Sequence, residues 1–171
     1  MIRRFLIPLL FVACAALAQD PWASVPEILA RIVPPQFPAR DFVITKYGAK
    51  GNGGDASAAI TKAIDACVKA GGGRVVVPKG DYITGPIRLR SHVELHLDTG
   101  ATLRFSQDPS RYPLVLTRWE GVELMNYSPL IYALDCEDVA ITGEGTLDGQ
   151  ADEAHWWNWK PTGKDHPPQP Q

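Results

Sequence analysis

The sequence has little of what marks several common protein classes. Among 171 residues there are three cysteines and four histidines, and their spacing matches no metal-ligand pattern. Lys and Arg number 17 against 19 Asp and Glu, so the basic excess typical of nucleic-acid-binding domains is missing. The charged fraction of 21% and the hydrophobic fraction of 45% are ordinary globular values, which argues against disorder. We therefore expect a folded chain with no metal, no cofactor and no nucleic-acid partner.

No apolar run reaches the roughly 20 residues of a permanent membrane span. The longest run, 5–15, follows the positive pair Arg3-Arg4 and precedes the small residues 16–18, which together make the three parts of a secretory signal peptide. We expect cleavage after Ala18 and export to the periplasm or the outside. Losing the two arginines takes the formal net charge from -2 to -4. A faint lipobox-like match before Cys14 leaves lipidation open.

Proline dominates the chain that follows the signal peptide. Residues 19–40 hold Pro21, Pro26, Pro34, Pro35 and Pro38, which predicts a lead-in without long regular structure. After it, 41–47 is predicted to be a strand and 48–54 a loop.

Residues 56–70 predict the one convincing helix. Asp55 or Ser57 is expected to cap its start, and the glycines at 71–73 to end it. Two cysteines, Cys67 and Cys136, remain in the mature chain; they could form a disulfide, but we favour buried free thiols. The apolar residues at helical spacing that form one stripe are Ile60, Ala63, Ile64, Cys67 and Val68.

After this helix the apolar period changes from 3.6 to 2. A short apolar run at 75–77 and alternating runs at 87–90, 93–98 and 101–105 predict the strands of an all-β fold. The segment from Val93 is echoed from Val139 at an offset of about 44–46 positions, which we interpret as two turns of about 22 residues in a parallel β-helix. A β-sandwich gives similar alternation, so the pattern alone leaves both folds open.

Eight short blocks stand out between Asp41 and Trp159. They are Tyr47–Gly51, Ala59–Ile64, Gly72–Pro78, Thr84–Ile87, Ser91–Leu97, Gly100–Leu103, Asn126–Ala133 and Ile141–Gly149. Together they resemble the N-terminal region of glycoside hydrolase family 28, the polygalacturonases. The first block is shared across the wider pectin-lyase-like superfamily, whereas the later blocks favour the hydrolases over the lyases.

The resemblance implies an all-β fold, a right-handed parallel β-helix of the pectin-lyase-like type whose N-terminal coils are capped by the helix at 56–70. It also implies hydrolysis of α-1,4-galacturonan with inversion, in which one carboxylic acid protonates the glycosidic oxygen and carboxylates opposite activate water. The family signatures for this chemistry are Asn-Thr-Asp, Asp-Asp, Gly-His-Gly and Arg-Ile-Lys, and none occurs in this sequence. We therefore assign no catalytic residue to the chain, and its substrate-binding residues stay unassigned.

Two groups of side chains are candidates for a site. The carboxylates could supply an acid/base pair, but we favour solvated turns because no apolar pocket is evident beside them. Trp156, Trp157 and Trp159 could stack on sugar rings, but packing against the β-helix is the default for side chains of this size. The carboxylates in question are Asp135, Glu137, Asp138, Asp148, Asp152 and Glu153.

The predicted organisation is a signal peptide at 1–18, a lead-in at 19–40, the N-terminal part of a β-helix domain at 41–159 and a loop or tail at 160–171. Because this tail offers no closing strand or cap, we expect a truncated chain that aggregates or dimerises and releases no reducing ends from polygalacturonate. The expected partner of the parent enzyme is a pectic polysaccharide. Three alternatives stay open: a rhamnogalacturonan hydrolase, a pectate lyase-like enzyme and a non-catalytic β-helical carbohydrate-binding module.

Overall fold

A computed structural model describes residues 20–157, which form two units, 20–34 and 35–157. The first unit holds one short helix, α1 (Val25–Ala30), which the proline content of the lead-in did not predict. Pro26 lies in its first turn, where a missing N–H breaks no helical hydrogen bond. No helix within 20–157 is long and apolar enough to cross a membrane. The predicted signal peptide, Cys14, Trp159 and the tail at 160–171 lie outside the described residues.

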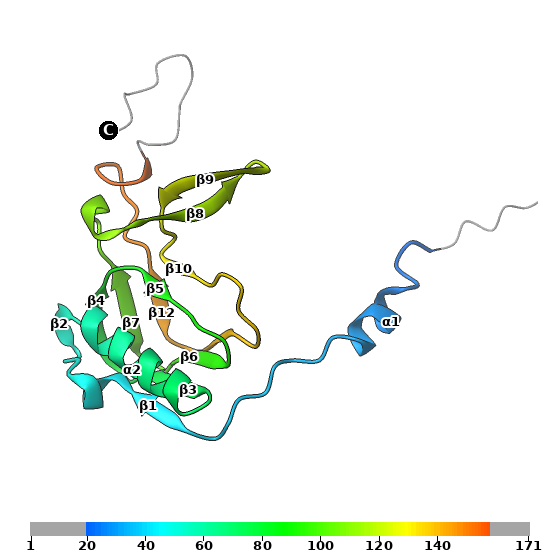
Figure 1. Ribbon diagram of the computed structural model, residues 1–171, viewed down its shortest axis with the longest axis horizontal. Helices are drawn as coiled ribbons and strands as arrows, with labels where there is room; N and C mark the ends of the chain where they lie inside the picture. Colours follow the sequence, from blue (N-terminus) through cyan, green and yellow to red (C-terminus); the bar gives the residue numbers. More distant parts are fainter. Residues whose placement is uncertain (1–19, 158–171) are drawn as a thin grey trace, which may run out of the picture. The chain divides into compact units, whose positions relative to one another are not determined.

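The second unit is a parallel β-helix made of three narrow parallel sheets and one antiparallel hairpin (Figure 1). Its strands are β1 (Asp41–Val43), β2 (Asn52–Asp55), β3 (Gly73–Val77), β4 (Gly80–Thr84), β5 (Ile87–Arg88), β6 (Val93–Leu97), β7 (Ala101–Phe105), β8 (Leu114–Trp119), β9 (Val122–Tyr127), β10 (Ile131–Tyr132), β11 (Ala140–Gly143) and β12 (Thr146–Asp148). The parallel sheets run β1-β3-β6-β11, β2-β4-β7-β12 and β5-β10. Stacked parallel strands confirm the predicted β-helix and exclude the β-sandwich, whose sheets are antiparallel.

The coil length differs from the prediction. Gly73 pairs with Val93 and Gly80 with Ala101, so an ordinary coil takes about 20 residues. The repeated segments pair directly, with Glu94 beside Ala140, so the offset of 46 positions is one coil and not two. Most of the extra length is the stretch between β7 and β10, which includes the hairpin β8–β9. This hairpin projects from the coil in Figure 1.

Two of the predicted elements near the start of the β-helix are also corrected. The strand expected over 41–47 ends at Val43 and continues as a 3-10 turn, η1 (Ile44–Tyr47), which Gly48 closes at φ 108°. The loop expected over 48–54 contains part of β2, which pairs with β4. A strand as rich in glycine as β2 has no side-chain alternation to reveal it, so only its pairing identifies it.

The predicted helix is confirmed as α2 (Ser57–Lys69), which packs on β3, β1 and β5. Its N-cap residue is Ala56, not Asp55 or Ser57, and Ala56 makes no side-chain capping hydrogen bond. Asp55 instead accepts hydrogen bonds from the Ser57 N–H (2.9 Å) and hydroxyl (2.7 Å). The predicted stripe faces the core, with Val68 half-buried and the rest buried. Cys67 in this stripe and the half-buried Cys136 are both free thiols.

Candidate functional site

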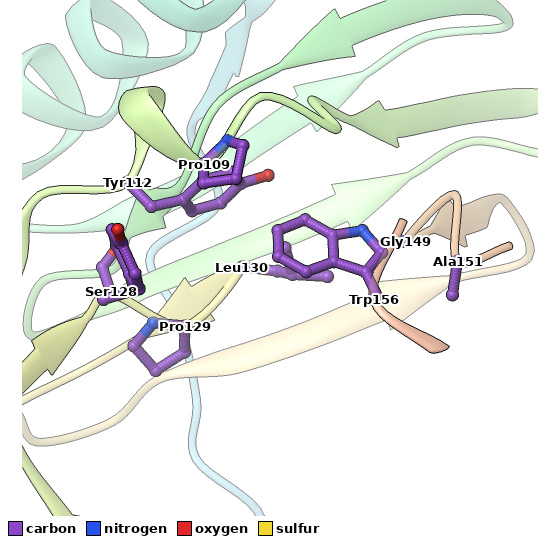
Figure 2. Close-up of a pocket in the computed structure, with 9 residues that line it drawn as sticks. Pro109, Tyr112, Ser128, Pro129, Leu130, Gly149, Ala151 and Trp156 are labelled. Atoms are coloured by element: carbon purple, nitrogen blue, oxygen red, sulfur yellow. The ribbon is translucent and has the colours of Figure 1, made fainter. Parts of the chain in front are cut away.

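The tryptophan segment forms one wall of a cavity of about 300 Å³ beside the hairpin. Trp156 packs edge-on against Tyr112, with ring centroids 5.9 Å apart and an interplanar angle of 86°. Figure 2 shows Trp156 on one side of the cavity and Ser128 and Pro129 on the other. The lining residues are Pro109, Tyr112, Tyr127, Ser128, Pro129, Leu130, Gly149, Ala151 and Trp156.

Tyr112 is the fixed side of this cavity. It follows the short 3-10 turn η2 (Pro109–Arg111), which begins where the Asp108 carboxylate accepts a hydrogen bond from the Ser110 N–H at 2.9 Å. The Tyr112 hydroxyl donates to the Ser106 carbonyl at 2.7 Å, and burial raises the pKa of this phenol. A buried, hydrogen-bonded ring of this kind holds one orientation.

Trp156 reaches the cavity from a loop that polar contacts tie to the coil. Gln107 donates to the Gln150 carbonyl at 2.8 Å and to the Asp152 carboxylate at 3.1 Å. Asp152 also accepts from the His155 ring at 2.8 Å, and this hydrogen bond lowers the pKa of the Asp152 carboxyl. Trp156 itself has φ 64°, a left-handed conformation that bulky residues rarely adopt. Such backbone strain persists where surrounding contacts over-determine it.

The three tryptophans thus have different surroundings. Trp156 is half-buried and both packs and lines the cavity, so the two roles considered for it are compatible. Trp157 is exposed over 58% of its surface. Trp159 lies outside the described residues.

The candidate carboxylates lie in turns or at exposed positions. Asp135 and Asp138 are exposed at φ 52° and 49°, and Asp138 lies 3.3 Å from the His92 ring. Asp148 accepts from the Gln150 N–H at 2.8 Å, a turn contact. Asp152 supports the tryptophan loop, as described above. None of the candidate carboxylates lines the cavity.

The remaining polar cluster lies on the outer face of β6 and β11. The His96 ring is 2.7 Å from the Thr142 hydroxyl, which donates to Glu94 at 2.6 Å. Within residues 20–157 no group of three or more His, Cys, Asp or Glu could hold a metal ion. We interpret the cluster as a cross-strand polar contact on the solvent face.

Sequence reasoning missed the residues that complete the cavity. Tyr112 lies 44 positions before Trp156, and Ser128 belongs to a block whose only signal is the family resemblance. Because an inserted hairpin separates Tyr112 from Ser128, no local periodicity connects them. The pair of Pro109 and Tyr112 after a strand was the one available signal of an ordered loop there.

Comparison with known proteins identifies the family. No protein-family model matches the chain. An exopolygalacturonase of Thermotoga maritima, described as hyperthermoactive, is 54% identical and superimposes with a TM-score of 0.74 over 78% of this chain and 30% of its own. A Yersinia enterocolitica family 28 exopolygalacturonase is 30% identical, with a TM-score of 0.59 over 66% of this chain and 21% of its own. This chain is a homologue of the family 28 polygalacturonases.

Curated relatives agree with the family 28 assignment. An exo-poly-alpha-D-galacturonosidase of Dickeya chrysanthemi is 37% identical over 115 residues, which are 62% of this chain and 19% of that protein. An exopolygalacturonase of Zea mays is 31% identical over 66% of this chain and 26% of its own length. The chain therefore spans about a fifth to a quarter of these curated relatives. The family 28 resemblance inferred from eight short blocks is confirmed, as is the right-handed parallel β-helix of the pectin-lyase-like type.

Proposed function

We propose that this chain forms N-terminal coils of a secreted glycoside hydrolase that cleaves the α-1,4-galacturonan of pectic polysaccharide with inversion. The observation that carries the proposal is the 54% identity to an exopolygalacturonase across a shared parallel β-helix. This identity covers 78% of the chain, so it is more specific than the fold, which hosts several chemistries.

Inverting hydrolysis needs an acid and a base whose carboxyl groups lie about 6.5–9.5 Å apart across the scissile bond. We assign none of this chain's described carboxylates to that pair, because the candidate carboxylates lie in turns or at exposed positions and none of them lines the cavity. The chain's own contribution is a rigid β-helical wall and an aromatic cavity that can contact a sugar ring. The N-terminal pattern of residues 1–18 supports export, and we keep the boundaries 19–40, 41–159 and 160–171 as proposed segments.

The test uses the protein encoded by the complete gene that contains this chain. Incubated with polygalacturonate, it should release reducing ends, and proton NMR of the first products should detect the β-anomer, because inversion converts an α-linkage. Reading the gene beyond the codon for Gln171 should reveal the Asn-Thr-Asp, Asp-Asp, Gly-His-Gly and Arg-Ile-Lys signatures. Unsaturated products would contradict hydrolysis and support a lyase.

A second function, a non-catalytic carbohydrate-binding module, is favoured by one observation. The cavity is aromatic and contains no carboxylate, which suits binding more than acid/base chemistry. Binding of pectin in affinity electrophoresis, without product release by the protein from the complete gene, would support this function. Release of rhamnose-terminated products from rhamnogalacturonan, with polygalacturonate left intact, would instead support the rhamnogalacturonan hydrolase.

A further inference from the structure

The cavity beside Trp156 is built to hold an uncharged group. None of its nine lining residues is Lys, Arg, His, Asp or Glu. Its volume of about 300 Å³ is at the lower end for ligand sites, which leaves room for a single sugar-sized group. A free uronate placed there would lose part of its hydration without gaining a cationic partner, which is unfavourable for an unpaired carboxylate.

The charged residues that flank the lining residues in sequence do not supply that partner. The Arg111 guanidinium, next to Tyr112, is held by the Asp55 carboxylate at 2.7 Å and the Ser57 hydroxyl at 2.9 Å. Asp152, next to Ala151, is anionic and already accepts from His155. The local charge therefore opposes an anion.

One polar atom in the lining can donate a hydrogen bond to a ligand oxygen. Ser128 is exposed over only 6% of its surface, and within residues 20–157 its hydroxyl has no hydrogen-bond partner. A buried hydroxyl without a partner costs free energy, and a ligand carbonyl would satisfy it. The apolar remainder of the lining, chiefly Tyr112, Leu130 and Trp156, matches a methyl group and the C–H face of a sugar.

We propose that this cavity binds a methyl-esterified galacturonate unit of pectin in preference to the free galacturonate. The proposal rests on the proposed function, because that function supplies the galacturonan chain. Esterification removes the negative charge, keeps a carbonyl acceptor for Ser128 and adds a methyl group for the aromatic wall. Hydrogen bonds hold the loop that carries Trp156 in place, so the aromatic wall is ordered before a ligand binds. This order reduces the entropic cost of binding.

The experiment compares two probes on the full chain, trigalacturonate methylated at every carboxyl and the same trimer unmethylated. Titrations followed by calorimetry should give at least about tenfold tighter binding of the ester, the discrimination that one methylene earns in an apolar pocket. Trp156→Ala should abolish this preference. The matched control is Trp119→Ala, which removes an exposed tryptophan at the tip of the hairpin and should leave both affinities unchanged.

Ser128→Ala provides a second variant should Trp156→Ala disturb folding, which circular dichroism and the melting temperature would reveal. It should reduce ester affinity several-fold with little effect on the free acid. Equal binding of the two trimers, tighter binding of the acid or no binding of either would overturn the proposal. Hydrolysis of polygalacturonate by the protein from the complete gene tests the proposed function separately, so the two failures are distinguishable.

Discussion

Gly72, at the end of α2, has a backbone conformation and a position that both exclude a side chain. Its φ is 99°, and a Cβ placed there would lie 2.7 Å from the His92 carbonyl oxygen. The left-handed conformation alone costs a non-glycine residue about 1–3 kcal/mol. We expect Gly72→Ala to lower the free energy of unfolding by more than this conformational cost, because the backbone of the next coil must also move. Urea denaturation measures the change.

Gly121 is the matched control for this prediction. It has a similar φ of 88° in the turn of the hairpin, and a Cβ there would meet nothing within 4 Å. Gly121→Ala should therefore lower the free energy of unfolding only by the cost of the left-handed conformation. If the two substitutions changed the free energy of unfolding equally, the close approach of residue 72 to His92 would add nothing to the conformational cost.

Asp55 connects the start of α2 to the loop before the hairpin, and it should make the fold sensitive to acid. Partial burial raises its pKa, but hydrogen bonds from Ser57 and the charge of Arg111 outweigh this and leave the pKa below its usual value. A carboxyl whose pKa is lower in the folded state stabilises the fold above its unfolded pKa of about 3.9. That contribution is lost as the pH falls below about 4 through the folded pKa.

Asp55→Asn should therefore melt at a lower temperature than the parent at pH 7. Below about pH 4 its melting temperature should fall less steeply than that of the parent. Differential scanning fluorimetry across this range measures both effects. Arg111→Gln should flatten the acid decline in the same direction, though less, because the Ser57 hydrogen bonds remain. An unchanged acid profile in Asp55→Asn would refute the role given to this carboxylate.

At the scale of elements, α2 covers the core of the first coils. Ile64 is almost completely buried in its apolar stripe and lies in the core cluster. Ile64→Ala should lower the free energy of unfolding by about 2–5 kcal/mol, through lost burial and the cavity left behind. Lys62→Ala, on the exposed side of the same helix, should change it by less than about 0.5 kcal/mol. Guanidinium denaturation of both variants compares the two faces, and similar small effects would contradict a capping role for α2.

Elements with a strong apolar periodicity were predictable from the sequence. Elements that form only through pairing with distant strands were not. The stripe from Ile60 to Val68 and the alternation of β6 and β7 fix one buried face each, so local sequence identifies them. In β8 and β9, large apolar side chains such as Leu116 and Met125 are exposed, and this inverts the usual relation between hydrophobicity and burial. The direct pairing of β6 with β11 depends on that unrecognised hairpin, which is why one long coil was interpreted as two.

The candidate site was predictable to a smaller extent than the fold. The tryptophan run itself suggested either packing or sugar contact, and Trp156 does line a cavity. Its partners Tyr112 and Ser128 lie on either side of the hairpin in sequence. They come together in the cavity only because the hairpin folds back on itself. Sequence spacing carries no signal for a cavity assembled in this way.

At the scale of the whole molecule, the interior side chains form columns that become exposed at the last coil of the described residues. Val75, Leu95 and Ile141 occupy paired positions on successive strands, and the first two are fully buried whereas Ile141 is 47% exposed. A second column runs from Leu103, fully buried, to Leu147, 40% exposed. Within residues 20–157, β11 pairs only with β6 and β12 only with β7, so each leaves one unpaired edge.

An apolar column that ends beside unpaired backbone groups is a template for pairing with another chain. We therefore expect the full chain to self-associate at micromolar concentration, and sedimentation velocity should detect dimers or larger species. The double substitution Ile141→Lys and Leu147→Lys should shift the distribution toward monomer, because pairing would then bury two charges without partners. Trp119→Lys, which adds a charge on the hairpin, is the control and should leave the distribution unchanged if the β11–β12 edge is the contact. A sharply melting monomer of the unsubstituted chain at the same concentration would contradict the prediction. The fold would then be stable with the ends of both apolar columns exposed to water.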